Sequence, residues 1–145
     1  MYFLDTNVVS ELRKIRSGKA DANAGRWAGS VRAIELFISV VTLQELQIGV
    51  LLTEFCDPLK GKVFRSWLAS HVLPAFVGRV LSVDAAVSLR SAQLHVPDPK
   101  SFRDGLIVAT ARMHSMTVIT RNIQDFELTG AKLLNPWIAT SGWPG

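Results

Sequence analysis

Short apolar runs alternate along this chain with longer stretches in which apolar residues recur at helical spacing. The runs are rich in β-branched and large apolar side chains, a pattern that predicts buried strands. Four of these runs lie at residues 1–4, 36–41, 80–83 and 117–120, and a shorter one at 132–134 predicts a fifth strand. Few polar residues interrupt them, so we expect each strand to lie inside the molecule.

The amphipathic stretches between the runs predict helices. They cover residues 8–14, 22–31, 42–54, 60–73, 84–94 and 101–114. Several begin at a residue type that commonly caps a helix, such as Thr42, Asp84 or Ser101. Strands that alternate with helices predict a parallel sheet with helices packed against it. We therefore expect an α/β fold, an α/β/α sandwich with a mainly parallel sheet of four to five strands. A single domain over residues 1–140 and a loose tail at 141–145 complete this prediction.

Composition supports a packed domain. Hydrophobic residues make up 48% of the 145 residues and charged residues 19%, and the mean hydropathy is +0.24. Such a chain buries enough apolar surface to fold without staples, which excludes disorder. The apolar excess has two interpretations: a core rich in Leu, Val and Ala, or additional apolar surface that a second chain covers.

Cysteine and histidine point to no particular chemistry. The single cysteine, Cys56, excludes an internal disulfide framework, and its apolar helical neighbourhood predicts a buried thiol. His71, His95 and His114 lack the spacing of a zinc site, so we expect surface or helix-end positions. Asp5 interrupts the apolar opening of the chain, and no apolar run approaches the length of a membrane span. We expect a soluble, cytoplasmic protein.

The net charge favours acidic partners without identifying one. It is +4, and the sequence pI is near 9.6, which weakly favours nucleic acid as a partner. Two basic groups could guide such a partner: Arg13, Lys14, Arg16 and Lys19 form the first, and Lys100, Arg103 and Arg121 form the second. Each of these side chains, taken alone, is better explained as ordinary solvated charge.

Three acidic residues stand near predicted helix starts. Asp5 ends the first strand, Glu45 lies one turn into the helix after the second strand, and Asp104 lies in the first turn of the helix before the fourth. Ligands of open parallel sheets collect beyond the carboxyl ends of the strands, which brings Asp5 and Glu45 together. Asp104 joins them only if the loop at residues 96–99 returns the chain to that edge.

Each acid also has a purely structural explanation. Thr42 with Glu45, and Ser101 with Asp104, fit the capping-box pattern, and Asp5 could be a helix N-cap. A joint role is favoured because a carboxylate after an apolar strand needs a partner, and helix starts tolerate converging negative charge. Converging carboxylates without histidine or cysteine suit Mg²⁺ or Mn²⁺, which can activate water against a phosphodiester.

Several motifs follow one another in a specific order. They lie at residues 4–12 (LDTNVVSEL), 39–49 (SVVTLQELQIG), 104–111 (DGLIVATA) and 118–122 (VITRN), with DF at 125–126 and NPW at 135–137. Together they resemble the PIN-domain family, and more closely the VapC/FitB-type toxins of bacterial type II toxin–antitoxin modules. Each motif alone is weak, but the resemblance runs over nearly the whole chain, from residue 2 to about residue 137.

This resemblance implies a PIN fold and a Mg²⁺- or Mn²⁺-dependent endoribonuclease that hydrolyses RNA, with tRNA and mRNA as candidate targets. It implies that Asp104 lies at the acidic pocket, and that Asp5, Glu45 and Asp104 are the catalytic and metal-binding acids. It assigns an orienting role to Thr6, Asn7 and Thr120.

The fourth acidic position departs from the family pattern. Asn122 stands where that acid follows a Thr-Arg pair, and Asp125 lies three residues later. Asn122 could bind a metal through its carbonyl oxygen, while Asp125 could supply the missing charge or merely cap the turn before Phe126. Both residues stay in the candidate catalytic set. A weaker second metal position is expected if Asn122 is the equivalent residue.

The resemblance also implies protein partners. These are a small cognate antitoxin whose basic side chain enters the acidic pocket, a second copy of the chain in a homodimer, and a larger toxin–antitoxin complex that meets operator DNA only through the antitoxin. Trp27, Phe64 and Trp67 are candidate interface residues, although core positions suit aromatics at helical spacing better.

Two other functions stay open. One is a PIN-type nuclease that acts in RNA processing or on DNA. The other is a non-catalytic module that binds nucleic acid or protein and uses its acids only as helix caps.

Overall fold

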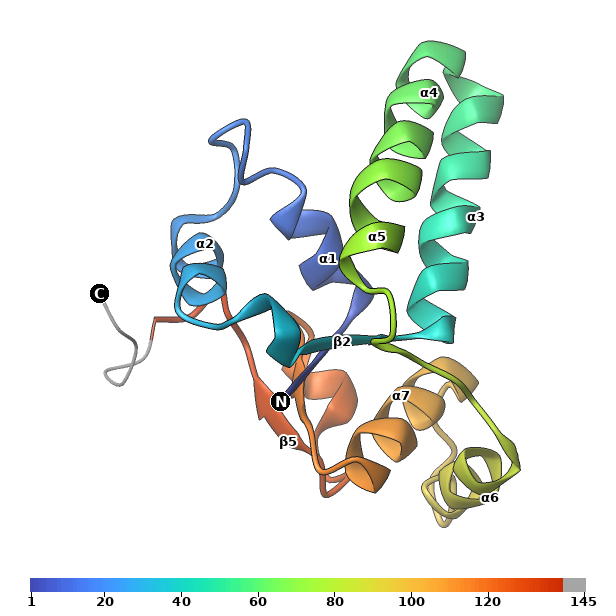
Figure 1. Cartoon of the computed structure of the whole chain (residues 1–145). Coiled ribbons are helices and arrows are strands. Elements are labelled where there is room, and N and C mark those ends of the chain that lie inside the picture. The colour runs from blue at the N-terminus through green and yellow to red at the C-terminus, as the bar shows by residue number, and fades with distance from the viewer. Residues whose placement is uncertain (140–145) are drawn as a thin grey trace.

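A five-stranded parallel sheet forms the centre of the computed structural model, which describes residues 1–139 (Figure 1). The strands are β1 (Tyr2–Leu4), β2 (Leu36–Ser39), β3 (Val80–Leu81), β4 (Thr117–Ile119) and β5 (Lys132–Leu134). Their order is β3-β2-β1-β4-β5, and every neighbouring pair is parallel. The predicted fold class and the five predicted strands are confirmed.

Helices cover both faces of this sheet. One face carries α1 (Thr6–Leu12), α2 (Ala22–Gly29), α3 (Val40–Cys56) and α4 (Pro58–Trp67), and the other carries α6 (Ala85–Gln93) and α7 (Phe102–Met113). α4 continues through a π-helical turn at Leu68–Val72 into α5 (Leu73–Ala75), and short 3₁₀ turns lie at Ala33–Glu35 and Ile123–Phe126. The chain is thus the expected α/β/α sandwich.

The middle strand, β1, joins two hydrophobic cores. Successive side chains of a strand point to opposite faces of the sheet. Phe3 accordingly packs with Ile107 of α7 in one core, whereas Leu4 packs with Val8 of α1 and Trp27 of α2 in the other. The side chains of Phe3 and Leu4 are both completely buried. The end of this strand is therefore held firmly from both faces, and Asp5 follows directly.

α3 and α4 form a helical hairpin that projects from the sheet (Figure 1). Arg65 of α4 donates two hydrogen bonds to Glu54 of α3, at 2.5 and 2.7 Å, and Gly61 is buried against the backbone of Glu54. The hairpin also exposes several large apolar side chains, namely those of Ile48, Leu51, Leu52, Phe55, Leu59 and Val63. Part of the apolar excess of the sequence therefore lies on its surface.

The boundary between β2 and α3 differs from the prediction. The strand ends at Ser39, and Val40 begins the helix. The hydroxyl oxygen of Ser39 accepts a hydrogen bond from the Val41 amide at 3.0 Å and so caps the helix. The prediction that Thr42 opens this helix is wrong, because the earlier cap overrides the strand preference of the two valines.

Cys56 is exposed, which contradicts the predicted buried thiol. It is the last residue of α3, at the far end of the hairpin beside Phe55, whose side chain is also exposed. The apolar residues near Cys56 in sequence therefore do not enclose it. Trp27, by contrast, is buried in the core, and Phe64 and Trp67 pack partly buried against it.

Two further predictions concern the extent of the chain. Among the described residues, the structure contains no helix with the length and apolar character that crossing a membrane requires. The predicted tail at residues 141–145 lies outside the described residues.

Candidate active site

Asp5 lies at the carboxyl end of β1 and caps α1. Its carboxylate accepts hydrogen bonds from the Thr6 amide and from the Thr120 hydroxyl, both at 2.8 Å. The N-cap explanation is therefore correct as far as it goes. It does not account for the contact with Thr120, which comes from the end of the neighbouring strand β4, nor for a further contact with an arginine described below.

Glu45 reaches the same place from the second turn of α3. Its Oε1 accepts a hydrogen bond from the Thr6 hydroxyl at 2.6 Å. The capping-box explanation of Glu45 fails, because Ser39 and not Thr42 caps this helix. Thr42 is buried, with its hydroxyl 3.3 Å from that of Thr6. Glu45 is thus held by Thr6, the first residue of α1, rather than by the start of its own helix.

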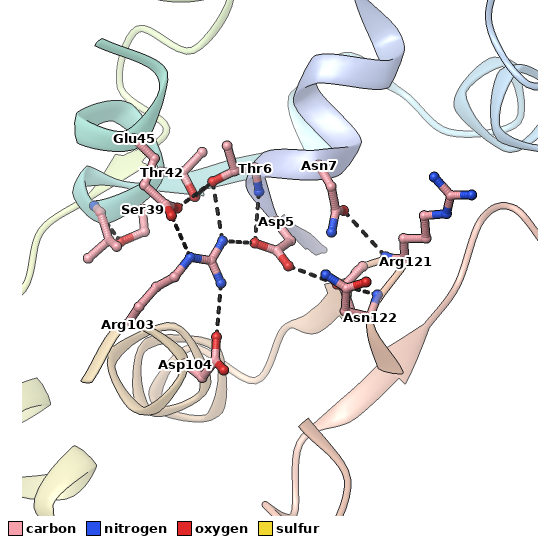
Figure 2. A network of polar contacts seen from close by, with 12 residues as sticks. Asp5, Thr6, Asn7, Ser39, Thr42, Glu45, Arg103, Asp104, Arg121 and Asn122 are labelled. Carbon is pink, nitrogen blue, oxygen red and sulfur yellow. Dashed lines mark hydrogen bonds and ion pairs between the residues drawn. The ribbon is translucent and has the colours of Figure 1, made fainter. Parts of the chain in front are cut away.

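Asp104 comes to the pocket in the first turn of α7. Its backbone amide donates to the Ser101 hydroxyl at 3.1 Å, so the N-cap half of the predicted capping box exists. The carboxylate points to the pocket instead of closing the box (Figure 2). The segment between α6 and α7 therefore returns the chain to the carboxyl edge of the sheet, as convergence of the acids requires.

A single arginine, Arg103, connects the three acids (Figure 2). Its Nε donates to Glu45 at 2.7 Å, its Nη1 donates to Asp104 at 2.9 Å, and its Nη2 donates to Asp5. The two predictions for Arg103 were a residue that guides an acidic partner and an ordinary solvated charge, and the second is wrong. An arginine in the first turn of a helix, where positive charge is disfavoured, was the signal that sequence reasoning missed.

The charge of Arg103 is secured by its partners. Burial lowers the pKa of the guanidinium, but the hydrogen bond to Glu45 and the negative charge of Asp5 outweigh this effect. The pKa of Arg103 is therefore raised above its ordinary value. The guanidinium therefore carries its positive charge at every physiological pH.

The pocket is open to solvent, and every residue that lines it is polar or charged. It has a volume of about 490 Å³ and is lined by Asp5, Thr6, Asn7, Glu45, Ser101, Arg103, Asp104, Asn122 and Asp125. Both candidates for the fourth position thus lie on its wall, and both side chains are exposed. Asp125 lies in the 3₁₀ turn after Asn122, and its amide donates to the Asn122 carbonyl at 3.1 Å.

Three polar residues that the resemblance assigned to orientation have different surroundings. The Thr6 hydroxyl donates to Glu45, and the Thr120 hydroxyl donates to Asp5. The Oδ1 of Asn7 instead accepts from the backbone amide of Arg121 at 3.3 Å. Thr120 also accepts from the Asn122 amide at 3.0 Å, and its side chain is completely buried. These bonds tie the loop after β4 to the start of α1.

The donor set of the pocket fits a hard divalent cation. Carboxylate and amide oxygens are the ligands that Mg²⁺ and Mn²⁺ prefer, and the pocket residues offer these without histidine or cysteine. Within residues 1–139, no three acidic, histidine or cysteine side chains stand close enough to hold a metal as they are placed. The guanidinium of Arg103 occupies the space between Asp5, Glu45 and Asp104. The oxygen ligands of the pocket therefore suit a divalent metal, and in this structure the guanidinium of Arg103 lies between them.

Two of the other predicted basic residues stack on aromatic rings. The guanidinium of Arg13 lies 4.3 Å from the ring centroid of Phe64, and that of Arg121 lies 5.3 Å from that of Trp137. Cations held in this way are partly ordered at the surface. His71 and His114 are exposed, and His95 accepts from the Lys100 amide at 3.1 Å, which agrees with their predicted surface and helix-end positions.

Comparison with known proteins places these features in a family. The model of the PIN domain matches residues 2–131. VapC ribonuclease Y4jK of Sinorhizobium fredii is 35% identical over 142 residues, which cover 94% of this chain and 98% of that protein. Toxin FitB of Neisseria gonorrhoeae is 34% identical over 143 residues, which cover 94% and 99%. The solved structure of FitAB bound to an IR36 DNA fragment matches with a TM-score of 0.87 at 31% identity, covering 98% of this chain and 99% of that one.

Proposed function

Because this chain belongs to the PIN-domain family, in its VapC/FitB group, we propose that it is the toxin of a toxin–antitoxin module and a metal-dependent endoribonuclease. Asp5, Glu45 and Asp104 form its active site, and RNA phosphodiester bonds are its substrate. The alternatives of a nuclease in RNA processing and of a non-catalytic module have less support, since the relatives named above are a ribonuclease and a toxin.

One observation carries this proposal. Three carboxylates, from the N-cap of α1, from α3 and from α7, meet closely enough to share one guanidinium. Helix capping explains Asp5 alone and needs no such meeting. Three negative charges gathered in one pocket repel one another unless a cation lies between them, so the arrangement fits a protein that binds cations there.

The three acids differ in depth, which suggests different roles. The side chains of Asp5, Asp104 and Glu45 are 2%, 19% and 34% exposed. Asp5, fixed by Thr6 and Thr120, is the anchor of the site. Glu45 faces solvent most and can orient a water molecule and accept its proton. Thr6 holds Glu45 in the orientation for this role.

Asp5, Asp104 and Glu45 are the residues that would hold Mg²⁺ or Mn²⁺, with Asn122 or Asp125 as a further oxygen donor. When bound, this ion supplies Lewis-acid activation of water and of the scissile phosphate. Hydrolysis leaves a 5′-phosphate and a 3′-hydroxyl. The surrounding basic residues, among them Arg13 and Arg121, would guide the RNA backbone to the pocket.

The proposal includes the partners of a toxin. They are a cognate antitoxin, a second copy of the chain in a homodimer, and operator DNA reached through the antitoxin. The solved structure of FitAB bound to a DNA fragment supports the protein partner and the DNA in this set. Because its substrate would be cellular RNA, we place the protein in the cytoplasm.

The Asp104→Asn variant tests the active site. It should abolish Mn²⁺-dependent cleavage of a single-stranded RNA while the thermal midpoint changes little. Asparagine keeps the size of the side chain and an oxygen for Arg103, but it lacks the charge that a metal needs. Cleavage is followed on denaturing gels with and without chelator, and unfolding by circular dichroism.

Asp98→Asn provides the matched control, since Asp98 is exposed and lies outside the acidic pocket. It should cleave RNA as the unmodified protein does. Full activity of Asp104→Asn would refute the site assignment. Total RNA, tRNA and single-stranded DNA, tested in parallel, separate a ribonuclease from a DNA-cleaving enzyme. Absence of stoichiometric Mn²⁺ binding in calorimetry would favour the non-catalytic module.

A further inference from the structure

We propose that Arg103 and the divalent cation are alternative occupants of the acidic pocket, so that the chain's own arginine keeps the nuclease inactive until the metal displaces it. This inference rests on the proposed function, because it presumes that the three acids bind a metal. It adds that the chain carries its own competitor for that site.

The hydrogen bonds of the pocket leave little room for both cations. Each nitrogen of the Arg103 guanidinium contacts a different acid. Thr120 occupies the second oxygen of Asp5, and Thr6 occupies the second oxygen of Glu45. Of the six carboxylate oxygens of Asp5, Glu45 and Asp104, five therefore have a donor among the described residues. A metal that binds all three acids must remove the guanidinium.

Local structure gives no other reason for the placement of Arg103. It lies in the first turn of α7, where the helix dipole makes a positive charge unfavourable. An arginine at such a position would normally extend into water. Here only 30% of its side chain is exposed, and its contacts go to Asp5, which follows β1, and to Glu45 of α3 in addition to its neighbour Asp104. The acids of the pocket, not the helix, hold it in place.

The balance of charge allows the exchange. One guanidinium neutralises one of the three negative charges, so the pocket stays negative overall and attracts further cations. A divalent ion neutralises more of this charge than arginine does. The pocket is open to solvent at Arg103, so its flexible side chain can leave by rotation without movement of the backbone. Metal binding and release of Arg103 are then a single exchange.

Calorimetry of Mn²⁺ binding tests this competition without relying on activity. Arg103→Met keeps an unbranched side chain about as long as the aliphatic part of arginine and removes the competing charge. It should bind Mn²⁺ at the same stoichiometry but about tenfold or more tightly, because the binding-competent pocket is no longer a minor state. Arg65→Met, which removes an arginine that donates two hydrogen bonds to Glu54 on the distant hairpin, should bind Mn²⁺ as the unmodified protein does.

The remaining outcomes separate this inference from the proposed function. Equal Mn²⁺ affinity in Arg103→Met and the unmodified protein overturns the competition but leaves metal-dependent cleavage standing. The substitution Asp5→Asn shows whether Mn²⁺ binds at the pocket. If it removes no Mn²⁺ binding from either protein, both the competition and the proposed function are overturned.

Unneutralised acids could prevent Arg103→Met from folding without metal. Thermal unfolding with and without Mn²⁺ covers this case, and Arg103→Lys provides a second variant that keeps a charge but cannot reach three acids at once. Mn²⁺ should raise the midpoint of both variants more than that of the unmodified protein. An equal rise in all three proteins argues against Arg103 as a competitor.

Discussion

A single hydroxyl group, that of Thr120, connects the ends of β1 and β4 at the acidic pocket. It donates to Asp5 and accepts from the Asn122 amide, and it is completely buried. Buried carboxylates need fixed donors, because an unpaired oxygen there loses its hydration without compensation. Thr120 therefore positions Asp5 without itself facing the pocket.

Replacing Thr120 by valine should separate this positioning role from simple packing. The isosteric side chain leaves one oxygen of Asp5 with no donor, and we expect unfolding to become easier by about 1–3 kcal/mol. RNA cleavage should fall by about 10–100-fold, as is common when a residue that orients a metal ligand is lost. Urea unfolding and cleavage assays measure the two effects.

Thr110→Val is the matched control for this variant. Thr110 is also completely buried, but its hydroxyl donates only to the Leu106 carbonyl within α7, at 2.8 Å. This change should cost less than about 1 kcal/mol and leave cleavage unchanged. Similar losses in both variants would contradict the special role of Thr120.

The sequence allowed the acids of the pocket to be predicted but not the cation between them. Asp5 and Glu45 follow strands that were recognisable as apolar runs, so their meeting follows from the parallel sheet. The contacts of Arg103 with Asp5 and Glu45 could not be predicted, because these two acids come from elements far away in the sequence. Its place in the first turn of a helix was the only sign. The capping-box pattern at Thr42 was misleading, since it ignores the earlier cap at Ser39. Whether Asn122 or Asp125 completes the site stays a prediction.

At the scale of elements, the α3–α4 hairpin depends on close contact between two helices at Gly61. A Cβ atom added at Gly61 would lie within 2.6 Å of the backbone nitrogen of Glu54. Backbone atoms cannot yield as the end of a flexible side chain can. Gly61 therefore determines how closely α4 packs on α3.

Gly61→Ala should accordingly lower the free energy of unfolding by about 1–3 kcal/mol, the usual effect of overpacking. Gly49→Ala, in the interior of α3, is the control, since nothing lies within 4 Å of a Cβ atom there. It should raise stability by about 0.5–1 kcal/mol, because alanine restricts the unfolded chain more than glycine does. Denaturant unfolding of both variants measures this difference, and equal effects would exclude close packing as the cause.

The ion pair between Glu54 and Arg65 makes the same hairpin sensitive to pH. The hydrogen bond from Arg65, more than its charge, lowers the pKa of Glu54 below its ordinary value of 4.5. The group contributes stability above that value and loses the contribution as the pH falls through the lowered pKa. A double-mutant cycle of Glu54→Gln and Arg65→Met should show coupling at pH 7 that decreases as the pH falls below 4.5.

The pair is exposed, so we expect the coupling to be small and to weaken in high salt. Coupling that does not decrease as the pH falls below 4.5 would show that shape rather than charge joins the two residues. The existence of both helices was predictable from their apolar periodicity. The ion pair was not, because nothing in the sequence specifies which faces of α3 and α4 meet.

At the scale of the whole molecule, the apolar residues that the sequence has in excess lie in two kinds of place. Two cores on opposite faces of the sheet take one part, with residues such as Leu4 and Ile107. Another part stays on the surface of the hairpin, where Phe55 and Leu59 are almost fully exposed. The interpretation as a core rich in apolar residues is thus confirmed, whereas the covering of the exposed part by a second chain stays a prediction. Composition alone could not apportion them, because burial depends on which helices find a neighbour.

The central place of β1 has a consequence for synthesis. β1 is made before the other four strands, yet Tyr2 pairs with Thr117, so the middle of the sheet is complete only after β4 has been made. Asp104 and Thr120 belong to that late part as well. A polypeptide that ends before Asp104 therefore lacks one acid of the pocket, and under the proposed function it would have no nuclease activity.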